Sequence, residues 1–258
     1  MGRFASTVEF YSRYREPYPP EFFRAVAERL GLRGTEKLLD VGCGPGLLAI
    51  GFGPFVARAT GLDPEPAMIE AAKTAAASAG LALSLVQGRV EEFSRAESFD
   101  LVTIGRALHW LDRDATLAVL EHIVPASGRI LICGASSSES ALSLWTEAYE
   151  HVRRSWAAEG PGEHERRYRI DGKTWFAGSC FGEAGMVSVT ERRQLTVEAL
   201  VGRALSKSNT SPTRLGERRA QFEEEIAAVL EPFAQDGVLN EEIVARASIF
   251  ARLPGRSR

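Results

Sequence analysis

The chain has few cysteines and no long apolar run. Its 258 residues include three cysteines, Cys43, Cys133 and Cys180. Three thiols that far apart and odd in number do not indicate a disulfide framework or a zinc site, so no metal is predicted. An apolar stretch of about 18 residues and an apolar amino-terminal segment of the signal-peptide kind are both missing. We therefore expect a cytoplasmic protein that does not bind a membrane.

The chain also lacks a strong charge of either sign. Its formal net charge of −3 gives no overall attraction to nucleic acid or to anionic lipid. Internal repeats and low-complexity tracts are missing as well. A chain of this length can bury a full core, and α/β folds of this size commonly form one domain. We expect one domain, as a monomer or a homodimer.

The most informative segment is residues 38–46, Leu-Leu-Asp-Val-Gly-Cys-Gly-Pro-Gly. An apolar run that ends at Asp40 and breaks into alternating glycines predicts a buried strand followed by a tight turn, whose backbone can approach a ligand closely. A helix predicted over 47–57 directs free N–H groups to the same place. Leu47 stands where a dinucleotide fingerprint needs its third glycine, and no P-loop Gly-Lys-Ser/Thr follows. The segment predicts an adenosine-like ligand without a pyrophosphate.

Asp63 is the second feature of this kind. It ends a strand predicted over 59–62 and stands 23 positions after Asp40. That offset is near the roughly 20 residues expected for a carboxylate that binds both ribose hydroxyls. Asp63 could instead cap a helix that starts near Glu65, and the two roles are compatible.

Strands and helices alternate along the chain. Strands are predicted over 37–41, 59–62, 81–87, 99–105, 129–133, 186–190 and 242–251, and helices over 20–30, 47–57, 67–79, 115–123, 139–157, 197–206 and 215–230. Such alternation implies right-handed crossovers and a parallel sheet with helices on both faces. Ligands then bind beyond the carboxyl ends of the strands.

On its motifs the chain resembles the class I S-adenosylmethionine-dependent methyltransferases. The matching segments are 38–46, 61–64 with Met68, 86–93, 98–102 and 127–132. A further likeness, to a small-molecule subgroup that includes trans-aconitate-type enzymes (methyltransferase type 11), lies in 14–19 (Tyr-Arg-Glu-Pro-Tyr-Pro) and 107–112 (Ala-Leu-His-Trp-Leu-Asp). The resemblance implies a Rossmann-like α/β fold: a seven-stranded, mostly parallel sheet sandwiched by helices, with an inserted helical cap. It also implies S-adenosyl-L-methionine as cofactor and S-adenosyl-L-homocysteine as product.

The single domain is expected to have three parts. Residues 1–34 would form an amino-terminal lid segment, 35–135 the cofactor-binding core, and 136–258 the cap helices and the last strands. The resemblance implies that the cap covers the acceptor pocket.

The resemblance further implies roles for individual residues. Asp40 and the turn would hold the amino-acid end of the cofactor, and Asp63 its ribose. The full set of expected cofactor-binding residues is Asp40, Gly42, Cys43, Gly44, Gly46, Asp63, Pro64, Met68, Val90, Glu91, Gly105 and Arg106. Arg89 stands where the family often carries an aspartate for the adenine amino group. Because arginine has no acceptor, that contact would come from the backbone or from Glu91.

Four residues are expected on the acceptor side, namely Tyr14, Tyr18, His109 and Trp110. A histidine suits removal of a proton from an attacking hydroxyl or amine, so His109 is the candidate catalytic residue, with pocket lining or packing as the alternative. The two tyrosines suit a lid that excludes water, or equally a contact that docks the segment on the core.

One basic stretch could meet an anionic acceptor. It consists of Arg153, Arg154, Arg166, Arg167 and Arg169, and Glu159, Glu163 and Glu165 lie among them. Because the acidic residues largely balance the arginines, a solvated surface is the favoured interpretation.

We therefore predict an enzyme that methylates oxygen or nitrogen of a small-molecule acceptor by in-line displacement. In such a reaction the protein mainly positions and desolvates the reactants. Methyl-ester formation on a small polycarboxylic acid and a non-catalytic nucleoside-binding module stay open as alternatives. Residues 105–108 (Gly-Arg-Ala-Leu) replace the Asn/Asp-Pro-Pro-aromatic motif of base amino-methyltransferases, which argues against a nucleic acid substrate.

Overall fold

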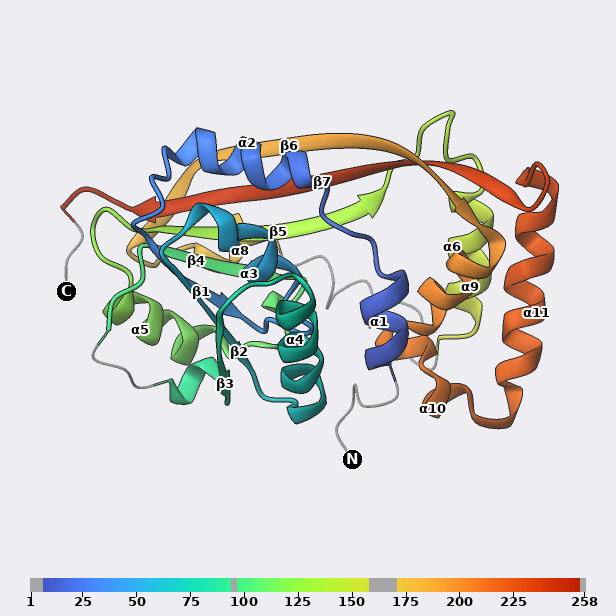
Figure 1. The fold of residues 1–258 in the computed structure, drawn as a ribbon, viewed down its shortest axis with the longest axis horizontal. Helices are drawn as coiled ribbons and strands as arrows, with labels where there is room; N and C mark the ends of the chain where they lie inside the picture. The colour runs from blue at the N-terminus through green and yellow to red at the C-terminus, as the bar shows by residue number, and fades with distance from the viewer. Residues whose placement is uncertain (1–6, 94–96, 158–170, 256–258) are drawn as a thin grey trace. The chain divides into compact units, whose positions relative to one another are not determined.

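The fold is described from a computed structural model, in which the described residues are 7–93, 97–157 and 171–255. Seven strands form one sheet in the order β3-β2-β1-β4-β5-β7-β6 (Figure 1). The strands are β1 (Lys37–Val41), β2 (Arg58–Asp63), β3 (Leu83–Gln87), β4 (Leu101–Gly105), β5 (Arg129–Ser137), β6 (Phe181–Thr196) and β7 (Val238–Arg252). The α-helices are α1 (Val8–Tyr14), α2 (Pro20–Leu30), α3 (Leu47–Phe52), α4 (Pro66–Ser78), α5 (Arg113–Ile123), α6 (Thr146–Ser155), α8 (Gly172–Phe176), α9 (Val197–Leu205), α10 (Pro212–Leu215) and α11 (Arg219–Leu230).

The predicted fold class is confirmed. The pairs β1–β2, β1–β4, β2–β3 and β4–β5 are all parallel. All seven predicted strands are present, although β6 and β7 are considerably longer than the segments 186–190 and 242–251 predicted for them.

Three predicted helices are shorter than expected. The helix predicted over 47–57 ends at Phe52, and a 3₁₀ turn over Gly53–Phe55 follows, because Pro54 has no N–H to continue the α-helical ladder. The helix predicted from 215 begins at Arg219, since Gly216 takes a positive φ of 55°.

The prediction of one long helix over 139–157 is wrong for its first part, since α6 begins only at Thr146. In the residues before α6, serine side chains accept hydrogen bonds from backbone N–H groups. The Oγ of Ser140 accepts from Leu142 N at 3.3 Å, and that of Ser143 accepts from Glu242 N at 2.9 Å. The bond of Ser140 is local and competes with helix formation, whereas that of Ser143 ties the segment to β7.

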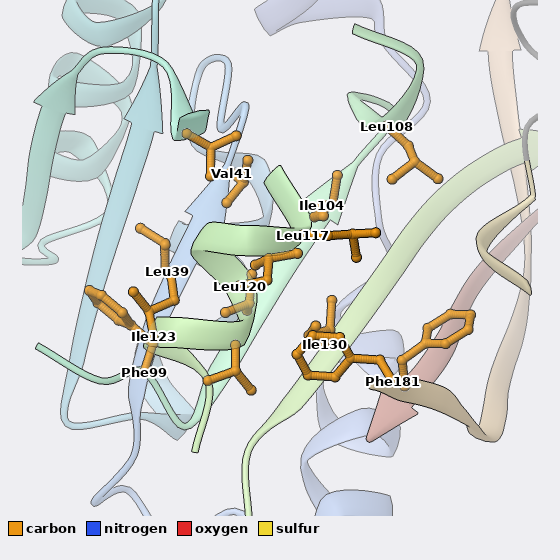
Figure 2. Packing of buried hydrophobic residues seen from close by; sticks show 14 of the residues in the cluster. Leu39, Val41, Phe99, Ile104, Leu108, Leu117, Leu120, Ile123, Ile130 and Phe181 are labelled. Atoms are coloured by element: carbon orange, nitrogen blue, oxygen red, sulfur yellow. The ribbon is translucent and has the colours of Figure 1, made fainter. Parts of the chain in front are cut away.

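The sheet faces are decided by the alternation of side chains along β1. Leu39 and Val41 point into an apolar cluster that α5 covers through Leu117 and Leu120 (Figure 2). Because successive residues of a strand point to opposite faces, Asp40 points the other way, toward α3. Helices therefore cover both faces of this part of the sheet.

Two compact units can be distinguished, and each is described by itself. The core unit consists of 18–134, 165–189 and 245–258, and the helical unit of 1–17, 135–164 and 190–244. The boundaries fall inside β5, β6 and β7. The division into lid, core and cap parts at residues 34 and 135 stays a prediction.

The helical unit has an apolar core of its own. Four-residue spacing puts Phe222, Ile226 and Leu230 on one face of α11, where all three are buried. Leu200 and Ala204 of α9 belong to the same cluster. An amphipathic pattern of period 3.6 therefore builds this unit, as it builds helical bundles in general.

Candidate cofactor-binding site

The glycine turn lies between β1 and α3, at the carboxyl end of β1. Gly42, Gly44 and Gly46 have φ angles of 65°, 52° and 85°, which L side chains rarely adopt. A Cβ at Gly42 would also lie 2.6 Å from the Cβ of Ala107, closer than two carbons can pack. Glycine at position 42 is therefore required by both backbone conformation and space.

The N–H groups of the turn are largely used inside the protein. Gly42 N and Cys43 N both donate to Leu62 O, at 2.8 and 3.0 Å, and Gly46 N donates to Cys43 O at 2.9 Å. Together with a bond from Gly44 N described below, these contacts fix the turn against the end of β2. The free N–H groups predicted at this spot are those at the start of α3, and the prediction is corrected for Ala49 N alone, which donates to Asp40 Oδ2 at 3.2 Å.

Asp40 holds the start of α3. Its carboxylate is 1% exposed, with Oδ1 accepting from Thr103 Oγ1 at 2.8 Å and Oδ2 accepting from Ala49 N at 3.2 Å. The N-cap of α3 is Gly46, which has no side chain to bond the first N–H groups. Asp40 supplies that acceptor from the neighbouring strand instead.

The environment of Asp40 is unfavourable for its charge. Burial raises the pKa of Asp40 to about 7, although the bonds from Thr103 and Ala49 act in the opposite direction. The carboxylate of Asp63 also contributes to the rise in pKa. Near neutral pH, this carboxyl group is therefore poised between its two forms.

Asp63 joins the turn to the start of α4. Its Oδ2 accepts from Gly44 N and its Oδ1 from Glu65 N, both at 2.9 Å. The N-cap of α4 is Glu65, without a side-chain cap bond, so Asp63 does not cap that helix but bonds to the residue ahead of it. Its predicted role at the ribose stays a prediction. Burial raises the pKa of this carboxyl as well. Each carboxylate oxygen can accept a second hydrogen bond, so two acceptor positions stay open for ribose hydroxyls.

Met68 lies beside the turn, and Cys43 is one of the turn's own residues. A Cβ at Gly44 would be 3.9 Å from the Sδ of Met68, so the thioether lies directly beside the turn. Cys43 packs beneath it, because a Cβ at Gly61 would be 2.9 Å from the Cys43 Sγ. Both side chains are buried, whereas Pro64 is exposed.

The segment after β3 is fixed by Glu91. Its Oε1 accepts from Asp112 N at 2.9 Å and from Arg89 Nη2 at 3.2 Å. Asp112 in turn caps α5 by accepting from Ala115 N at 3.0 Å. Glu91 is thus committed to the protein on one oxygen, and Val90 lies in the apolar core.

The comparisons with known proteins agree with this geometry. Residues 38–126 match the family described as "Methyltransferase domain", and the match includes the glycine turn, Asp63, Glu91 and Arg106. The chain is similar in this segment, and in its fold, to the class I S-adenosylmethionine-dependent methyltransferases.

Curated relatives match this chain over part of their length. A ubiquinone biosynthesis O-methyltransferase of Methylocella silvestris is 35% identical over 38% of this chain and 34% of its own. An uncharacterised methyltransferase of Schizosaccharomyces pombe is 30% identical over 48% of this chain and 49% of its own. The chain therefore spans about half the length, or less, of these relatives.

Solved structures share the fold at low identity. A protein of Anaeromyxobacter dehalogenans, provisionally named a type II methyltransferase, aligns with a TM-score of 0.67 at 20% identity, over 93% of this chain and 98% of that one. An S-adenosylmethionine-dependent methyltransferase of Thiobacillus denitrificans, solved with S-adenosyl-L-homocysteine, aligns with a TM-score of 0.54 at 15% identity, over 98% and 99%. The trans-aconitate-type subgroup stays a prediction.

Among the residues expected at the cofactor and the acceptor, Tyr18 and Arg106 come together at the end of β4. The guanidinium carbon of Arg106 is 5.0 Å from the centre of the Tyr18 ring, a cation–π arrangement. Arg106 has a positive φ of 57°, which is unusual outside glycine. A Cβ at Gly105 would lie 3.3 Å from the Tyr18 hydroxyl. The structure thus brings Tyr18, Gly105 and Arg106 to one place.

His109 and Trp110 follow on a 3₁₀ turn over Leu108–Trp110. Their rings are 4.7 Å apart and both side chains are half-buried. Leu108 of the same turn is buried in the core cluster (Figure 2). The pair is therefore anchored at the end of β4, next to the residues expected at the cofactor.

Tyr14 belongs to the helical unit, where it packs on α9. Its ring occupies the space beside Gly202, whose Cβ would lie 2.3 Å from the Tyr14 ring, and its hydroxyl donates to Glu198 Oε1 at 3.3 Å. Within this unit the contacts dock Tyr14 on α9, while docking on the core and a role as a lid stay predictions.

The basic stretch is only partly a solvated surface. Arg153 is buried, because it lies four positions after the buried Tyr149 and so on the same face of α6. It forms an ion pair with Glu150 at 2.7 Å. Arg154 is exposed, as predicted. The other members of the stretch, Arg166, Arg167, Arg169, Glu159, Glu163 and Glu165, lie outside the described residues.

Sequence reasoning missed Thr103. Nothing in the local pattern of β4 marks it, but the register of β1 and β4 pairs it with Asp40. A polar residue in an otherwise apolar strand, next to a strand that ends in an acid, is the signal that could have found it.

Within 7–93, 97–157 and 171–255, no three histidine, cysteine or acidic side chains converge as metal ligands would. Over the same ranges, every helix is too short or too polar to cross a lipid bilayer.

Proposed function

We propose that the chain transfers the methyl group of S-adenosylmethionine to an oxygen or nitrogen atom of a small-molecule acceptor. The observation that carries this proposal is the bond from Gly44 N to Asp63 Oδ2 at 2.9 Å. This bond joins two predicted parts of one cofactor site. The glycine turn is expected at the methionine end of the cofactor, and the Asp63 carboxylate is expected at its ribose. Relatives named ubiquinone biosynthesis O-methyltransferases support a hydroxyl oxygen as the atom methylated.

S-adenosylmethionine, when bound, supplies an electrophilic methyl group on a sulfonium, so the protein has mainly to orient and desolvate the reactants. Because the N–H groups of the turn are used internally, the carbonyl oxygens of Gly42 and Gly44 would accept from the cofactor amino group. Asp63 would accept from the ribose hydroxyls, and Met68 and Val90 would bound the adenine.

His109 is the candidate general base. It would accept the proton that an acceptor hydroxyl or amine loses as it attacks the methyl group. Arg106 and Tyr18 would close the methionine end, since both lie against Gly105 and exclude water from it. Trp110 would form an apolar wall.

Binding and transfer should be measured separately. Calorimetry with S-adenosylmethionine and S-adenosyl-L-homocysteine tests the cofactor site. Incubation with methyl-tritiated cofactor and a panel of phenols, amines and carboxylic acids tests transfer, and release of S-adenosyl-L-homocysteine follows it. We expect binding of both nucleosides and labelling of at least one acceptor. Failure to bind either nucleoside would refute the proposal, and binding without any transfer would favour a nucleoside-binding module.

The base assignment has its own test. Replacing His109 with glutamine keeps a polar side chain but removes the imidazole that would accept the proton. We expect the rate of transfer to fall about 100-fold, within the usual range for general-base catalysis, and its acidic limb to disappear from the pH–rate profile. An unchanged profile would assign His109 to packing.

A further inference from the structure

Asp40 is a buried carboxyl group whose neighbours provide no counter-charge. It is 1% exposed, and its two hydrogen bonds come from neutral donors, the hydroxyl of Thr103 and the N–H of Ala49. Within 7–93, 97–157 and 171–255, the one charged group that acts on it is Asp63, which has the same sign. A buried charge is costly unless it is paired. The surroundings of Asp40 therefore oppose its ionised form.

Every element of the core unit that packs around Asp40 agrees with this. Helix α3 and strand β4 contain no titratable residue. At the carboxyl ends of β2 and β5 stand Asp63 and Cys133, and Cys43 stands in the turn. Burial, and after it the charge of Asp40, raises the pKa of both thiols. The cation that follows β4, Arg106, acts on Cys133. The turn thus contains two carboxyl groups and two thiols that all resist ionisation.

Thr103 allows Asp40 to exist in either protonation form. Its Oγ1 donates to Asp40 Oδ1 at 2.8 Å, and the hydroxyl can rotate to accept when the carboxyl group is protonated. Ala49 N donates to Oδ2 at 3.2 Å in both forms. A change of ionisation therefore breaks neither contact. Burial raises the pKa of Asp40 to about 7, so both forms are populated near neutral pH.

The turn that Asp40 precedes is the expected place of the charged end of the cofactor. The proposed function puts the methionine end of S-adenosylmethionine there, with its ammonium and sulfonium groups. S-adenosylmethionine has one positive charge more than S-adenosyl-L-homocysteine, because the product is a neutral thioether. A positive charge near a buried carboxyl group favours the ionised form. The cofactor would therefore provide the counter-charge that Asp40 does not find in the described part of the chain.

We propose that Asp40 distinguishes the cofactor from its product by charge: its carboxyl group gives a proton to solvent when S-adenosylmethionine binds and takes one from solvent once S-adenosyl-L-homocysteine remains. This inference rests on the proposed function, which places the cofactor at the turn. The two proton transfers of Asp40 cancel over one cycle. The proton that the attacking hydroxyl or amine loses leaves separately, so each methylation still releases one proton. The ionised form of Asp40 thus selects S-adenosylmethionine over the spent nucleoside.

The first experiment counts protons by calorimetry. Each nucleoside is titrated into the protein at pH 7 in phosphate and in imidazole buffer, whose heats of ionisation differ. The difference between the two measured heats gives the number of protons exchanged on binding. We expect S-adenosylmethionine to release about half a proton per site, because about half of the Asp40 groups carry a proton at that pH. S-adenosyl-L-homocysteine should release close to none.

The second experiment measures both affinities between pH 5.5 and 7.5, below the range of about 7.7–8.0 in which an α-amino group loses its proton. Affinity for S-adenosylmethionine should rise about tenfold over this interval, because protonation of Asp40 competes with binding at the acidic end. Affinity for S-adenosyl-L-homocysteine should change less than about twofold, since it adds no sulfonium charge.

Asp40→Asn is the decisive variant, because asparagine resembles the protonated acid and can keep both hydrogen bonds. It should release no proton and bind S-adenosylmethionine equally at every pH, about tenfold more weakly than wild type at pH 7.5. Asp114→Asn, at an aspartate whose side chain is 88% exposed, is the matched control and should behave as wild type.

Thr103→Val is the second variant, and it leaves the Asp40 carboxyl group in place. It removes the hydroxyl that stabilises the ionised form, in a side chain of nearly the same shape. We expect the rise in affinity for S-adenosylmethionine to move to higher pH by about one unit. A role of Asp40 that is only structural would move neither the proton count nor this curve. The test therefore holds even where Asp40→Asn does not fold, and an unshifted curve for Thr103→Val would then overturn the inference.

The outcomes separate this inference from the proposed function. Binding of both nucleosides without proton exchange would overturn the inference and leave the cofactor site in place. Proton release that persists in Asp40→Asn would assign the proton to another group, such as Asp63, and would overturn it as well. Failure of both nucleosides to bind would overturn the proposed function and this inference with it.

Discussion

Asp40→Asn is expected to stabilise the protein at alkaline pH. Asparagine resembles the protonated form of the acid, and it can serve both partners of Asp40. Its oxygen can accept from Ala49 N, and its amide can donate to the Thr103 hydroxyl, which rotates to accept. The variant therefore removes a buried charge and leaves the cap of α3 in place.

The magnitude follows from the pKa of Asp40. Burial raises this pKa from 3.8 to about 7, a difference that corresponds to about 4 kcal/mol. Because the folded protein retains a proton that the unfolded chain releases, Asp40 lowers the free energy of unfolding as the pH rises from about 4 to 7. Below that window the wild type and Asp40→Asn should be similar. Between pH 5 and 8.5 the advantage of the variant should grow by about 3 kcal/mol.

Urea unfolding at several pH values measures this difference. Asp114→Asn, at an aspartate whose side chain is 88% exposed, is the control and should track the wild type at every pH. A difference between Asp40→Asn and wild type that stays constant with pH would refute the reasoning. It would mean that the Asp40 carboxyl group titrates alike in the folded and unfolded chain.

Three further predictions concern the turn and the helical unit. Asp63→Ala should weaken S-adenosylmethionine binding by about 2–4 kcal/mol, because charge-assisted hydrogen bonds are lost; unchanged affinity in calorimetry would remove Asp63 from the ribose site. Gly42→Ala should destabilise the protein by about 1–3 kcal/mol, since its Cβ would lie 2.6 Å from that of Ala107 and its φ is positive; an unchanged melting temperature would show that the turn adapts. Glu241→Gln should cost about 3–5 kcal/mol in urea unfolding, because it leaves Arg203 buried without its counter-charge. The added change Arg203→Met should recover part of that loss, and a double variant no more stable than Glu241→Gln would contradict this account.

The core of the fold could be predicted because each strand is marked locally. Residues 37–41 form an apolar run that a glycine turn ends, and 66–78 form a helix with proline at its start. These signals depend on neighbours in the sequence. The strand β1 was therefore predicted with its observed bounds.

The long strands β6 and β7 could not be predicted in full. Residues 190–196 are rich in charged and polar side chains and resemble a loop. They extend β6 because partners on β7 pair with them, as in the bond from Arg193 Nε to Glu241 Oε2 at 2.6 Å. Cross-strand pairs of opposite charge stabilise a sheet but leave no local pattern.

The candidate site shows the same limit. The glycines and the two aspartates were found from spacing, whereas their partners depend on strand register and on turn geometry. Thr103 is bonded to Asp40 across 63 positions of the chain, and Asp112 N to Glu91 across 21. Such bonds are decided by how the strands align, which no single segment specifies.

The reactivity of the Cys43 thiol can report on opening of the glycine turn. Its thiol is packed against Gly61, and burial together with the nearby carboxylates raises its pKa, so the reactive thiolate is suppressed while the turn is closed. An alkylating reagent can modify this sulfur only during an opening that separates the turn from the end of β2. The rate of that modification therefore measures how often the turn opens, and a nucleoside that holds the turn closed would slow it.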